Sequence, residues 1–535
     1  MVSELPRLVV AAPASGHGKT TVATGLMAAL RRTGREVSGH KVGPDYIDPG
    51  YHALATGRPG RNLDPHLVGE DRIVPLLLHG ARFGGTRGGR PADIAVIEGV
   101  MGLYDGHIGR EGFASTAHVA RLTDSPVVLV VDISHASRTI AATVLGMATF
   151  DADVRIAGVV LNKAGSVRHS DEVRRALAPL GIPVLGVLQR DDDVTAPSRH
   201  LGLVPAAERP EAARSLDHLA GKVAASIDLE AVMRIARSAP PLRGQAWSAR
   251  EAVTGGGRGS GDDDKGRPLI AVAGGRAFTF RYAETVELLE AAGCSVAPFD
   301  PLADESLPDG TAGIYLGGGF PEVHAGDLAA NEPMLRALRA ATSAGVPTVA
   351  ECAGLLYLCR SLDGVPMVGA IDADAAMAPR LTLAYRRSTA VADSVLAAAG
   401  TEVTGHEFHR TAVTPTAGAA GAAGSAGAAG SAGAAGTAGT AGTAGTAGTA
   451  AGQRPAGAES GAVEGPLSSA SPAWTSTAGP EGFVTGSVHA SYLHTHWAGH
   501  PLLATRFAAQ VRTFARAPWH DRSAPGRRPA QLARP

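Results

Sequence analysis

Cysteine, net charge and long apolar runs are all scarce in this 535-residue sequence. Three cysteines cannot build a disulfide framework for a chain of this length, which suits a reducing compartment. A formal net charge of −1 provides neither a basic footprint for nucleic acid nor an acidic tail. No apolar run approaches the ~20 residues that a bilayer requires. We therefore expect a soluble, cytoplasmic protein, without a leader peptide, that binds neither nucleic acid nor membrane, and the length of the chain would suffice for about three domains.

The N-terminal half alternates short apolar runs with segments of helical length. The runs are rich in Val, Ile and Leu and fall at 8–12, 37–42, 94–97, 127–131, 156–161 and 184–188. Continuous runs of this kind predict a mostly parallel sheet with helices on both faces, and ligands gather at the carboxyl ends of such strands. A helical pattern over 216–236 closes this unit.

A glycine-rich turn follows the first run and precedes a helical pattern, which is the setting of a phosphate-binding loop. The turn reads Ala14-Ser-Gly-His-Gly-Lys-Thr-Thr21, with Pro13 where the usual pattern has its first glycine. Its backbone N–H groups and the helix N-terminus would face an anion, Lys19 would reach the terminal phosphates, and the Thr20 hydroxyl would hold Mg²⁺. The predicted ATP-binding residues in this loop are Ser15, Gly16, Gly18, Lys19, Thr20 and Thr21.

Carboxylates follow the second and third runs. Asp45 and Asp48 lie in Lys41-Val-Gly-Pro-Asp-Tyr-Ile-Asp-Pro49, while Glu98 and Asp105 lie in Glu98-Gly-Val-Met-Gly-Leu-Tyr-Asp-Gly106. A carboxylate at a strand end beside the phosphate loop suits Mg²⁺, so Glu98 and Asp45 join Thr20 as predicted metal ligands. The alternative is that Asp45 and Asp48 form turns beside proline and that Glu98 caps a helix.

Two polar segments follow the fifth and sixth runs. Asn162 precedes a lysine, and the pair resembles the Asn-Lys pairs that read a purine edge, so we include Asn162 in the ATP site. Arg199, in Pro197-Ser-Arg-His-Leu-Gly-Leu203, could hold a carboxylate or phosphate in bidentate fashion, or could be solvated at the surface.

Composition divides the chain into two domains. Residues 1–243 form the phosphate-loop domain, and the Gly- and Asp-rich stretch 244–266 is predicted to be a flexible linker. Residues 267–516 form a second domain. Within it, 412–479 is an Ala/Gly/Thr-rich, low-complexity insertion that cannot bury enough apolar surface to order itself, and 517–535 is a disordered tail.

The second domain places Cys352 between an apolar run and a helical pattern, in Val346-Pro-Thr-Val-Ala-Glu-Cys-Ala-Gly354. A nucleophile on such a turn needs small neighbours and gains from the helix N-terminus, which lowers a thiol pKa. Gly318 and Gly319, at a neighbouring strand end, could supply an oxyanion donor. Cys294 and Cys359 fit a core role better.

A cysteine nucleophile needs a base, and three histidines lie in Gly486-Ser-Val-His-Ala-Ser-Tyr-Leu-His-Thr-His-Trp497. On a regular strand His494 and His496 share one face and His489 takes the other, so spacing alone leaves the choice open. His406 and His409 would fall on opposite faces of a strand, which argues against a metal site there.

Taken together, the chain resembles the cobyrinic or hydrogenobyrinic acid a,c-diamide synthases of corrin biosynthesis. The resemblance rests on the segments quoted above and on Gly317-Gly-Gly-Phe-Pro-Glu322 and Gly405-His-Glu-Phe-His409. It implies an α/β protein with an N-terminal dethiobiotin-synthetase-like parallel-sheet domain and a C-terminal class I glutamine amidotransferase-like domain. The implied enzyme uses ATP, Mg²⁺ and L-glutamine to amidate the a- and c-acetates of a corrin acid through a phosphorylated carboxylate, as a step of cobalamin biosynthesis.

The resemblance also assigns roles. Cys352 would attack glutamine, with His494 as the base; His496 stands where most class I glutaminases have glutamate, so a Cys–His pair fits better than a triad. The implied substrate-binding residues are Tyr46, Asp48, Asp105 and Arg199. The sequence leaves open the cobalt content of the substrate, the order of amidation and the oligomeric state, a homodimer included. Competing interpretations are a cobyric acid synthase, a nickel-tetrapyrrole amidase, and a P-loop ATPase fused to an inactive amidotransferase-like module.

Overall fold

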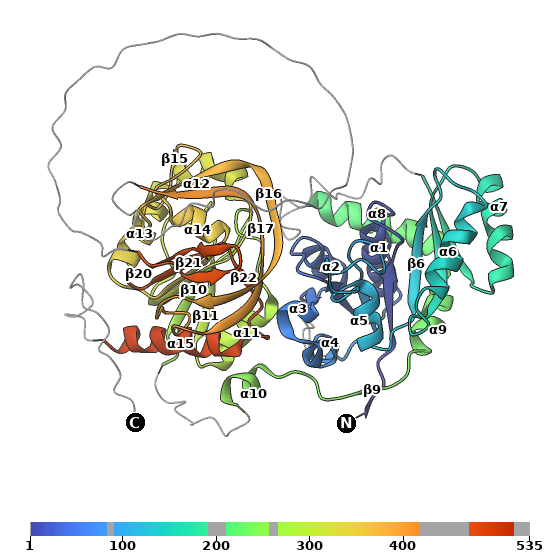
Figure 1. Ribbon diagram of the computed structural model, residues 1–535, viewed down its shortest axis with the longest axis horizontal. Coiled ribbons are helices and arrows are strands. Elements are labelled where there is room, and N and C mark those ends of the chain that lie inside the picture. The colour runs from blue at the N-terminus through green and yellow to red at the C-terminus, as the bar shows by residue number, and fades with distance from the viewer. Residues whose placement is uncertain (1, 83–89, 191–209, 256–265, 417–469, 518–535) are drawn as a thin grey trace, which may run out of the picture.

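The protein forms two α/β lobes that meet along a seam (Figure 1). The structure, a computed structural model, describes residues 2–82, 90–190, 210–255, 266–416 and 470–517. The predicted α/β class is confirmed in both lobes. Predictions for Arg199 and for most of the insertion and the tail lie outside the described residues.

The N-terminal lobe is built on a seven-stranded, wholly parallel sheet of order β4-β3-β5-β2-β6-β7-β8. Its strands are β2 (Arg7–Ala11), β3 (Val37–Val42), β4 (Arg61–Leu63), β5 (Ile94–Glu98), β6 (Val127–Asp132), β7 (Ile156–Ala164) and β8 (Val184–Gln189). The central strand β2 is buried on both sides: Leu8 and Val10 pack into one apolar cluster, and Val9 and Ala11 into another. Two covered faces explain why the sequence shows continuous rather than alternating apolar runs.

Helices cover the two faces of this sheet. They are α1 (Lys19–Arg32), α2 (Asp48–Thr56), α3 (Pro65–Val68), α4 (Ile73–Arg82), α5 (Thr116–Leu122), α6 (Thr139–Thr149), α7 (Val167–Leu177), α8 (Pro210–Ser226) and α9 (Leu229–Arg237). The helical pattern expected over 216–236 is divided between two helices, α8 and α9. Asp228 ends the continuity because its carboxylate accepts from the N–H of Ala231 and caps α9.

The C-terminal lobe has a core sheet of order β11-β10-β12-β13-β21-β20, in which only β20 is antiparallel. The strands are β10 (Leu269–Ala273), β11 (Ser295–Phe299), β12 (Thr311–Leu316), β13 (Thr348–Glu351), β20 (Phe483–Thr485) and β21 (Val488–Ser491). Its helices are α11 (Ala283–Ala291), α12 (Ala325–Ala330), α13 (Glu332–Ser343), α14 (Ala353–Leu358) and α15 (Pro501–Arg516). The C-terminal domain thus has the α/β organisation that the sequence predicts.

A second sheet in this lobe is dominated by a long ribbon of β16 (Ala373–Ala390) and β17 (Glu402–Pro415). Short strands extend it: β14 (Ser361–Leu362), β15 (Val365–Pro366), β18 (Trp474–Ser476), β19 (Gly479–Glu481) and β22 (His494–Thr495). Figure 1 shows the ribbon along the side of the lobe that faces α3. The ribbon therefore belongs to the seam.

Several boundaries differ from the expected ones. The predicted flexible linker 244–266 contains α10 (Ala249–Thr254), which packs against α11 and α15. It is capped by Ser248, whose hydroxyl accepts from the N–H of Glu251. The insertion begins later and ends earlier than 412–479, because β17 runs to Pro415 and β18 starts at Trp474. The small pairing of β1 (Val2–Ser3) with β9 (Leu242–Arg243) was not expected.

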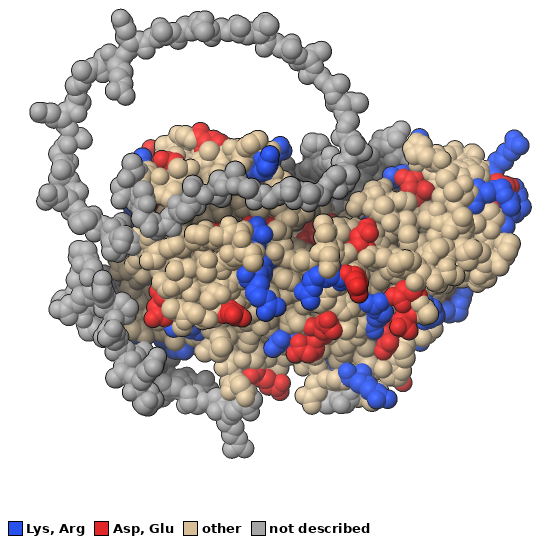
Figure 2. Space-filling model, viewed as in Figure 1, with Lys and Arg blue, Asp and Glu red and all other residues tan. Residues whose placement is uncertain are grey.

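The surface carries charges of both signs. On the face seen in Figure 2, Lys and Arg lie among Asp and Glu near the middle of the molecule, and no field of one sign forms there. Among the described residues, no helix is both long and apolar enough to cross a bilayer.

Candidate active sites

The phosphate loop joins the end of β2 to the start of α1. Gly18 is the residue before α1, and its φ of 90° lies in the left-handed region that glycine adopts without strain. A Cβ on Gly18 would lie 2.2 Å from the Asn162 side-chain nitrogen, so the packing also requires glycine here. The first-turn N–H groups of a 14-residue helix then face the loop, as anion binding needs.

The ends of β6 and β7 hold this loop in place. The Asn162 amide donates to the His17 carbonyl (2.9 Å), and Lys163 donates to the Gly16 carbonyl (2.8 Å) and to Asp132 (2.7 Å). His17 Nδ1 in turn accepts from the backbone N–H of Asp132 (2.9 Å). Asn162 was predicted to read the nucleotide base; here its amide nitrogen braces the loop.

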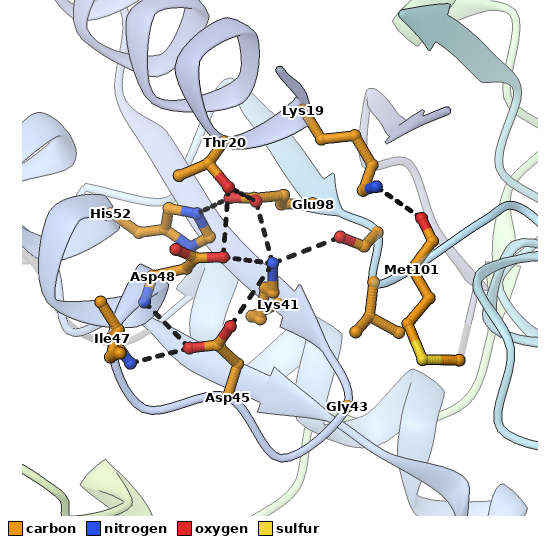
Figure 3. Close-up of polar contacts among 12 residues, drawn as sticks. Lys19, Thr20, Lys41, Gly43, Asp45, Ile47, Asp48, His52, Glu98 and Met101 are labelled. Carbon is orange, nitrogen blue, oxygen red and sulfur yellow. Dashed lines mark hydrogen bonds and ion pairs between the residues drawn. The ribbon is translucent and has the colours of Figure 1, made fainter. Parts of the chain in front are cut away.

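Lys19 lies beneath the loop and donates to the carbonyls of Ala14 (3.2 Å) and Met101 (2.5 Å). Burial, and then the neighbouring Lys41, lower the pKa of Lys19 to about 8. The bond to Met101 brings the segment after β5 over the phosphate loop (Figure 3). Asp105 belongs to this segment, where its carboxylate accepts from the N–H of Gly102 (3.0 Å).

A buried cluster of opposite charges lies at the carboxyl ends of β3 and β5 (Figure 3). Glu98 accepts from the Thr20 hydroxyl (2.6 Å) and from Lys41 Nζ (2.9 Å). Asp48, the first residue of α2, pairs with the same Lys41 and accepts from Thr20 (3.3 Å). The structure therefore brings Thr20, Asp48 and Glu98 together, whereas the strand-end argument predicted Asp45 in place of Asp48.

Two members of this cluster, Lys41 and His52, were not assigned a role from the sequence. His52 Nε2 lies 2.7 Å from Glu98 Oε2, and both side chains are fully buried. Burial opposes ionisation of Glu98, but Lys41 and His52 outweigh it and hold the pKa of that carboxyl well below its usual range. The spacing of Asp48 and His52 on one face of α2 was the available signal.

Asp45 has a divided role. One carboxylate oxygen accepts from the N–H groups of Ile47 (2.8 Å) and Asp48 (3.1 Å), which is the turn-forming alternative, while the other lies 3.8 Å from Lys41 Nζ. The hydrogen-bond and ion-pair partners that the structure gives Lys41 Nζ are oxygen atoms, and Mg²⁺ prefers oxygen ligands. The residues present therefore fit a Mg²⁺ that is completed by phosphate oxygens and water.

Tyr46 reaches across the seam. Its ring stacks on Phe280 (5.1 Å between centroids, 11° between planes) and lies 5.1 Å from the ring of His494. The loop that carries Asp45 and Asp48 thus contacts the second lobe directly.

In the C-terminal lobe, Cys352 stands between β13 and α14 with φ 49° and ψ −96°. This left-handed backbone is rare for a residue with a side chain and is the strand-to-helix turn that nucleophiles occupy. The small neighbour Gly354 is required, since a Cβ there would lie 2.5 Å from the Leu316 carbonyl oxygen. The Cys352 thiol is buried 3.9 Å from the Phe408 carbonyl. Burial, and then Glu322, raise the pKa of Cys352, so it rests as a thiol.

Gly318 and Gly319 were predicted to supply an oxyanion donor, and they follow strand β12 in the same lobe as Cys352. Gly318 exchanges backbone hydrogen bonds with Phe280 (2.9 and 3.0 Å), so its N–H is engaged in this conformation. A Cβ on Gly318 would lie 2.5 Å from His494 Cε1, which places the predicted base against this glycine. For Gly319 a Cβ would lie 1.9 Å from the Ala277 carbonyl oxygen, so the backbones pack closely there.

The three histidines of the C-terminal segment separate, because the expected single strand is split into β21 and β22. His489 bonds to Ser394 (2.9 Å) within the core. His494 stacks on His406 (5.0 Å, 15°), and neither ring nitrogen of His494 has a hydrogen-bond partner among the described residues. Burial, and then His409, lower the pKa of His494 to about 3, so the ring is neutral in this conformation. His496 packs against Tyr282 (4.1 Å).

Comparison with known proteins agrees with this division of the chain. Residues 8–204 match the CobQ/CobB/MinD/ParA nucleotide binding domain, and residues 269–449 match the CobB/CobQ-like glutamine amidotransferase domain. The protein is therefore an amide-forming, glutamine-dependent enzyme with a nucleotide-binding domain.

Relatives narrow the class to a family. The chain is 56% identical to the hydrogenobyrinate a,c-diamide synthase of Thermobifida fusca, over 95% of this chain and 97% of the relative. It is 50% identical to that of Streptomyces coelicolor (96% and 98% covered) and 42% identical to the cobyrinate a,c-diamide synthase of Synechococcus (76% and 86% covered). This chain belongs to the a,c-diamide synthase family.

Proposed function

We propose that this enzyme uses ATP and glutamine to convert the a- and c-acetate carboxylates of hydrogenobyrinate to amides in cobalamin biosynthesis. The metal-free corrin is favoured because the relatives at 50–56% identity carry that name and are matched over nearly their whole length. Cobyrinate is the second candidate, and its named relative is matched at 42% over 76% of this chain. The cytoplasm is the proposed location, since all three cysteines are free thiols.

The C-terminal site releases ammonia. Neutral His494 takes the proton of the Cys352 thiol, and the thiolate attacks the side-chain carbonyl of glutamine. The leaving amide nitrogen takes the proton back, and water then hydrolyses the thioester to glutamate. The N–H of Ala353 adjoins the Cys352 sulfur and is the first donor to the oxyanion. Gly319 is the second donor, since the N–H of Gly318 is engaged.

The N-terminal site activates the carboxylate. A substrate carboxylate attacks the γ-phosphate of ATP, and ammonia then displaces phosphate from the acyl phosphate, because oxygen of a free carboxylate is a poor leaving group. Lys19 and Lys41 neutralise the charge on the phosphoryl group as it moves. Thr20, Glu98 and Asp45 would hold Mg²⁺, which supplies further positive charge to the phosphates. Tyr46, Asp48, Asp105 and Arg199 are the proposed substrate contacts.

One observation carries the proposal: Tyr46 lies beside the carboxylate cluster in sequence and beside His494 in space. Ammonia made at Cys352 is therefore released at the seam where the acyl phosphate would form. A switch ATPase with an inactive second domain gives no reason for this juxtaposition.

The test is mass spectrometry of hydrogenobyrinic and cobyrinic acids incubated with the enzyme, ATP, Mg²⁺ and glutamine. We expect two carboxyl-to-amide exchanges on the metal-free corrin. Cys352→Ala should lose this activity with glutamine and keep it with ammonium. Exchange on cobyrinate alone would select the second candidate, and ATP turnover without exchange on either corrin would sink the proposal. Light scattering on the same samples would show whether the enzyme is a homodimer.

A further inference from the structure

Arg61 crosses the seam from the N-terminal lobe. It lies on the three-residue strand β4, is 1% exposed, and donates to Glu284 (2.6 Å) and to Glu287 (2.5 Å) on helix α11 of the other lobe. His79 of α4 adds a bond to Glu287 (2.8 Å). Strand β4 pairs with β3, whose Lys41 belongs to the carboxylate cluster. Arg61 is thus attached to the framework of the ATP site.

Glu284 contacts both Arg61 and His496, which lies two residues from the predicted base His494. One of its carboxylate oxygens is held by Arg61, and the other lies 3.7 Å from His496 Nε2. Both side chains are fully buried. Neither of the two facing atoms has a hydrogen-bond partner among the described residues. A buried carboxylate oxygen and a buried ring nitrogen that face each other without other partners are placed to interact when either one gains charge or a proton.

The group of charged side chains at the seam, formed by Arg61, His79, Glu284 and Glu287, carries surplus negative charge. The carboxylates of Glu284 and Glu287 both contact the Arg61 guanidinium. The formal charges of these three side chains therefore sum to −1 when His79 is neutral. Inside a protein this charge acts over a longer range than in water. It lies next to His496, two residues from His494, and therefore favours a positive charge on His496.

A second path joins the cluster to the base by packing. The Tyr282 ring lies 4.1 Å from His496, and its hydroxyl lies 3.3 Å from His406 Nε2. His406 stacks directly on His494. The position of α11, which begins at Ala283, thus sets where this stack of rings lies.

We propose that Arg61 is a positioning residue for glutamine hydrolysis, contributed by the ATP-binding lobe. It holds α11 in place, so that Glu284 faces His496 and Tyr282 packs against the rings that contact His494. The base is then oriented only when the lobes are docked. This inference rests on the proposed roles of Cys352 and His494.

The alternative is that the cluster only holds the lobes together. Glu284 and Glu287 distinguish the two explanations, because both pair with Arg61 and only Glu284 faces His496. Docking alone predicts that losing either carboxylate affects glutamate release and the stability of the protein together, whereas the proposal predicts that Glu284→Gln lowers kcat beyond its effect on stability.

The experiment compares glutamate release in the full-length wild type, Glu284→Gln, Glu287→Gln, Arg61→Ala and Arg61→Lys. We expect kcat for Glu284→Gln and Arg61→Ala to fall roughly 10- to 100-fold with little change in KM, the scale of a misplaced catalytic group. Arg61→Lys should recover part of the loss because it keeps the charge. Glu287→Gln should stay within a few-fold of wild type. Ammonium-driven amidation should be kept by all four variants, which shows that the ATP site is intact.

The pH profile is a second readout. Burial lowers the pKa of His496, and the charge of Glu284, which faces it, raises that pKa. Any limb of kcat/KM that depends on protonation of His496 should therefore move to lower pH in Glu284→Gln and stay in place in Glu287→Gln. The other titratable or charged groups around the pair are Arg61, His79, Tyr282, Glu287, His406 and His500.

Three outcomes decide the matter. A wild-type kcat and profile in Glu284→Gln, or equal losses in the two glutamate variants, overturns the positioning role while leaving the proposed function intact. Failure of the wild type to release Cys352-dependent glutamate overturns both. A selective loss in Glu284→Gln, with ammonium-driven amidation kept, supports it.

Discussion

Replacing Lys41 by methionine tests the carboxylate cluster. The Lys41 side chain is 4% exposed and is the ammonium group among three carboxylates, Asp45, Asp48 and Glu98. Its loss takes the formal charge of this cluster from −2 to −3 and leaves buried Glu98 with only His52 and Thr20 as partners. Removing one partner of a buried ion pair destabilises a protein by about 3–5 kcal/mol.

Lys163 provides the matched control. Its side chain is 40% exposed and pairs with Asp132 at 2.7 Å, so Lys163→Met should lower stability by at most about 1 kcal/mol. For a domain of this size, about 2–4 °C per kcal/mol predicts that Lys41→Met lowers the melting temperature of the N-terminal domain by about 6–20 °C.

The assay is scanning calorimetry with and without millimolar Mg²⁺. Mg²⁺ should raise the melting temperature of Lys41→Met more than that of the wild type, because the cation replaces the lost positive charge. A Lys41→Met protein as stable as Lys163→Met, or indifferent to Mg²⁺, would refute the reasoning.

Three further predictions concern single positions. Gly18→Ala should raise KM for ATP strongly, because the φ of 90° at Gly18 and its 2.2 Å approach to Asn162 both disfavour a Cβ. The control is Gly146→Ala, which has open space around the new Cβ and should leave KM unchanged. ATPase kinetics would show this difference. Gly318→Ala should lower glutamine-driven amidation on the order of 100-fold, because its Cβ would displace His494, and should spare ammonium-driven amidation. Gly326→Ala is the control. Equal rates of glutamine-driven amidation in the two variants would contradict the placement of the base. Burial opposes ionisation of Glu287, but His79 and Arg61 prevail and lower the pKa of its carboxyl to about 2. Glu287 therefore stabilises the fold above about pH 4.5, and this contribution is lost as the pH falls towards 2; acid unfolding of Glu287→Gln should lack this component, and an unchanged acid limb would argue against the pairing.

Much of the N-terminal lobe could be predicted from the sequence, because strands buried on both faces leave continuous apolar runs. Strand β3 ends as expected at Val42, and β5 extends the run at 94–97 by one residue, Glu98. Strand β4 escaped notice because its three residues are Arg, Asn and Leu. Arg61 is buried there only because its partners come from α11, more than 200 residues further along the chain.

The sites divide in a similar way. The turn at Cys352 could be predicted because small residues at fixed spacing leave a local pattern. The engagement of the Gly318 N–H by Phe280 could not, because it depends on a loop docking from elsewhere. Lys41 was visible in its motif, yet its role follows only from three carboxylates that converge from two strand ends and a helix start.

The ribbon of β16 and β17 sets a minimum length for the Ala/Gly/Thr-rich insertion. The chain leaves the ribbon at Pro415, which pairs with Ala373, and returns at Trp474, which pairs with Ala390 at the other end of β16. These ends are at most about 56 Å apart at ~3.3 Å per residue, a distance that about 17 extended residues can cover. The 53 residues from 417 to 469, which join Thr416 to Ala470, exceed that number about threefold, so a shorter connection should still be long enough to join the two ends.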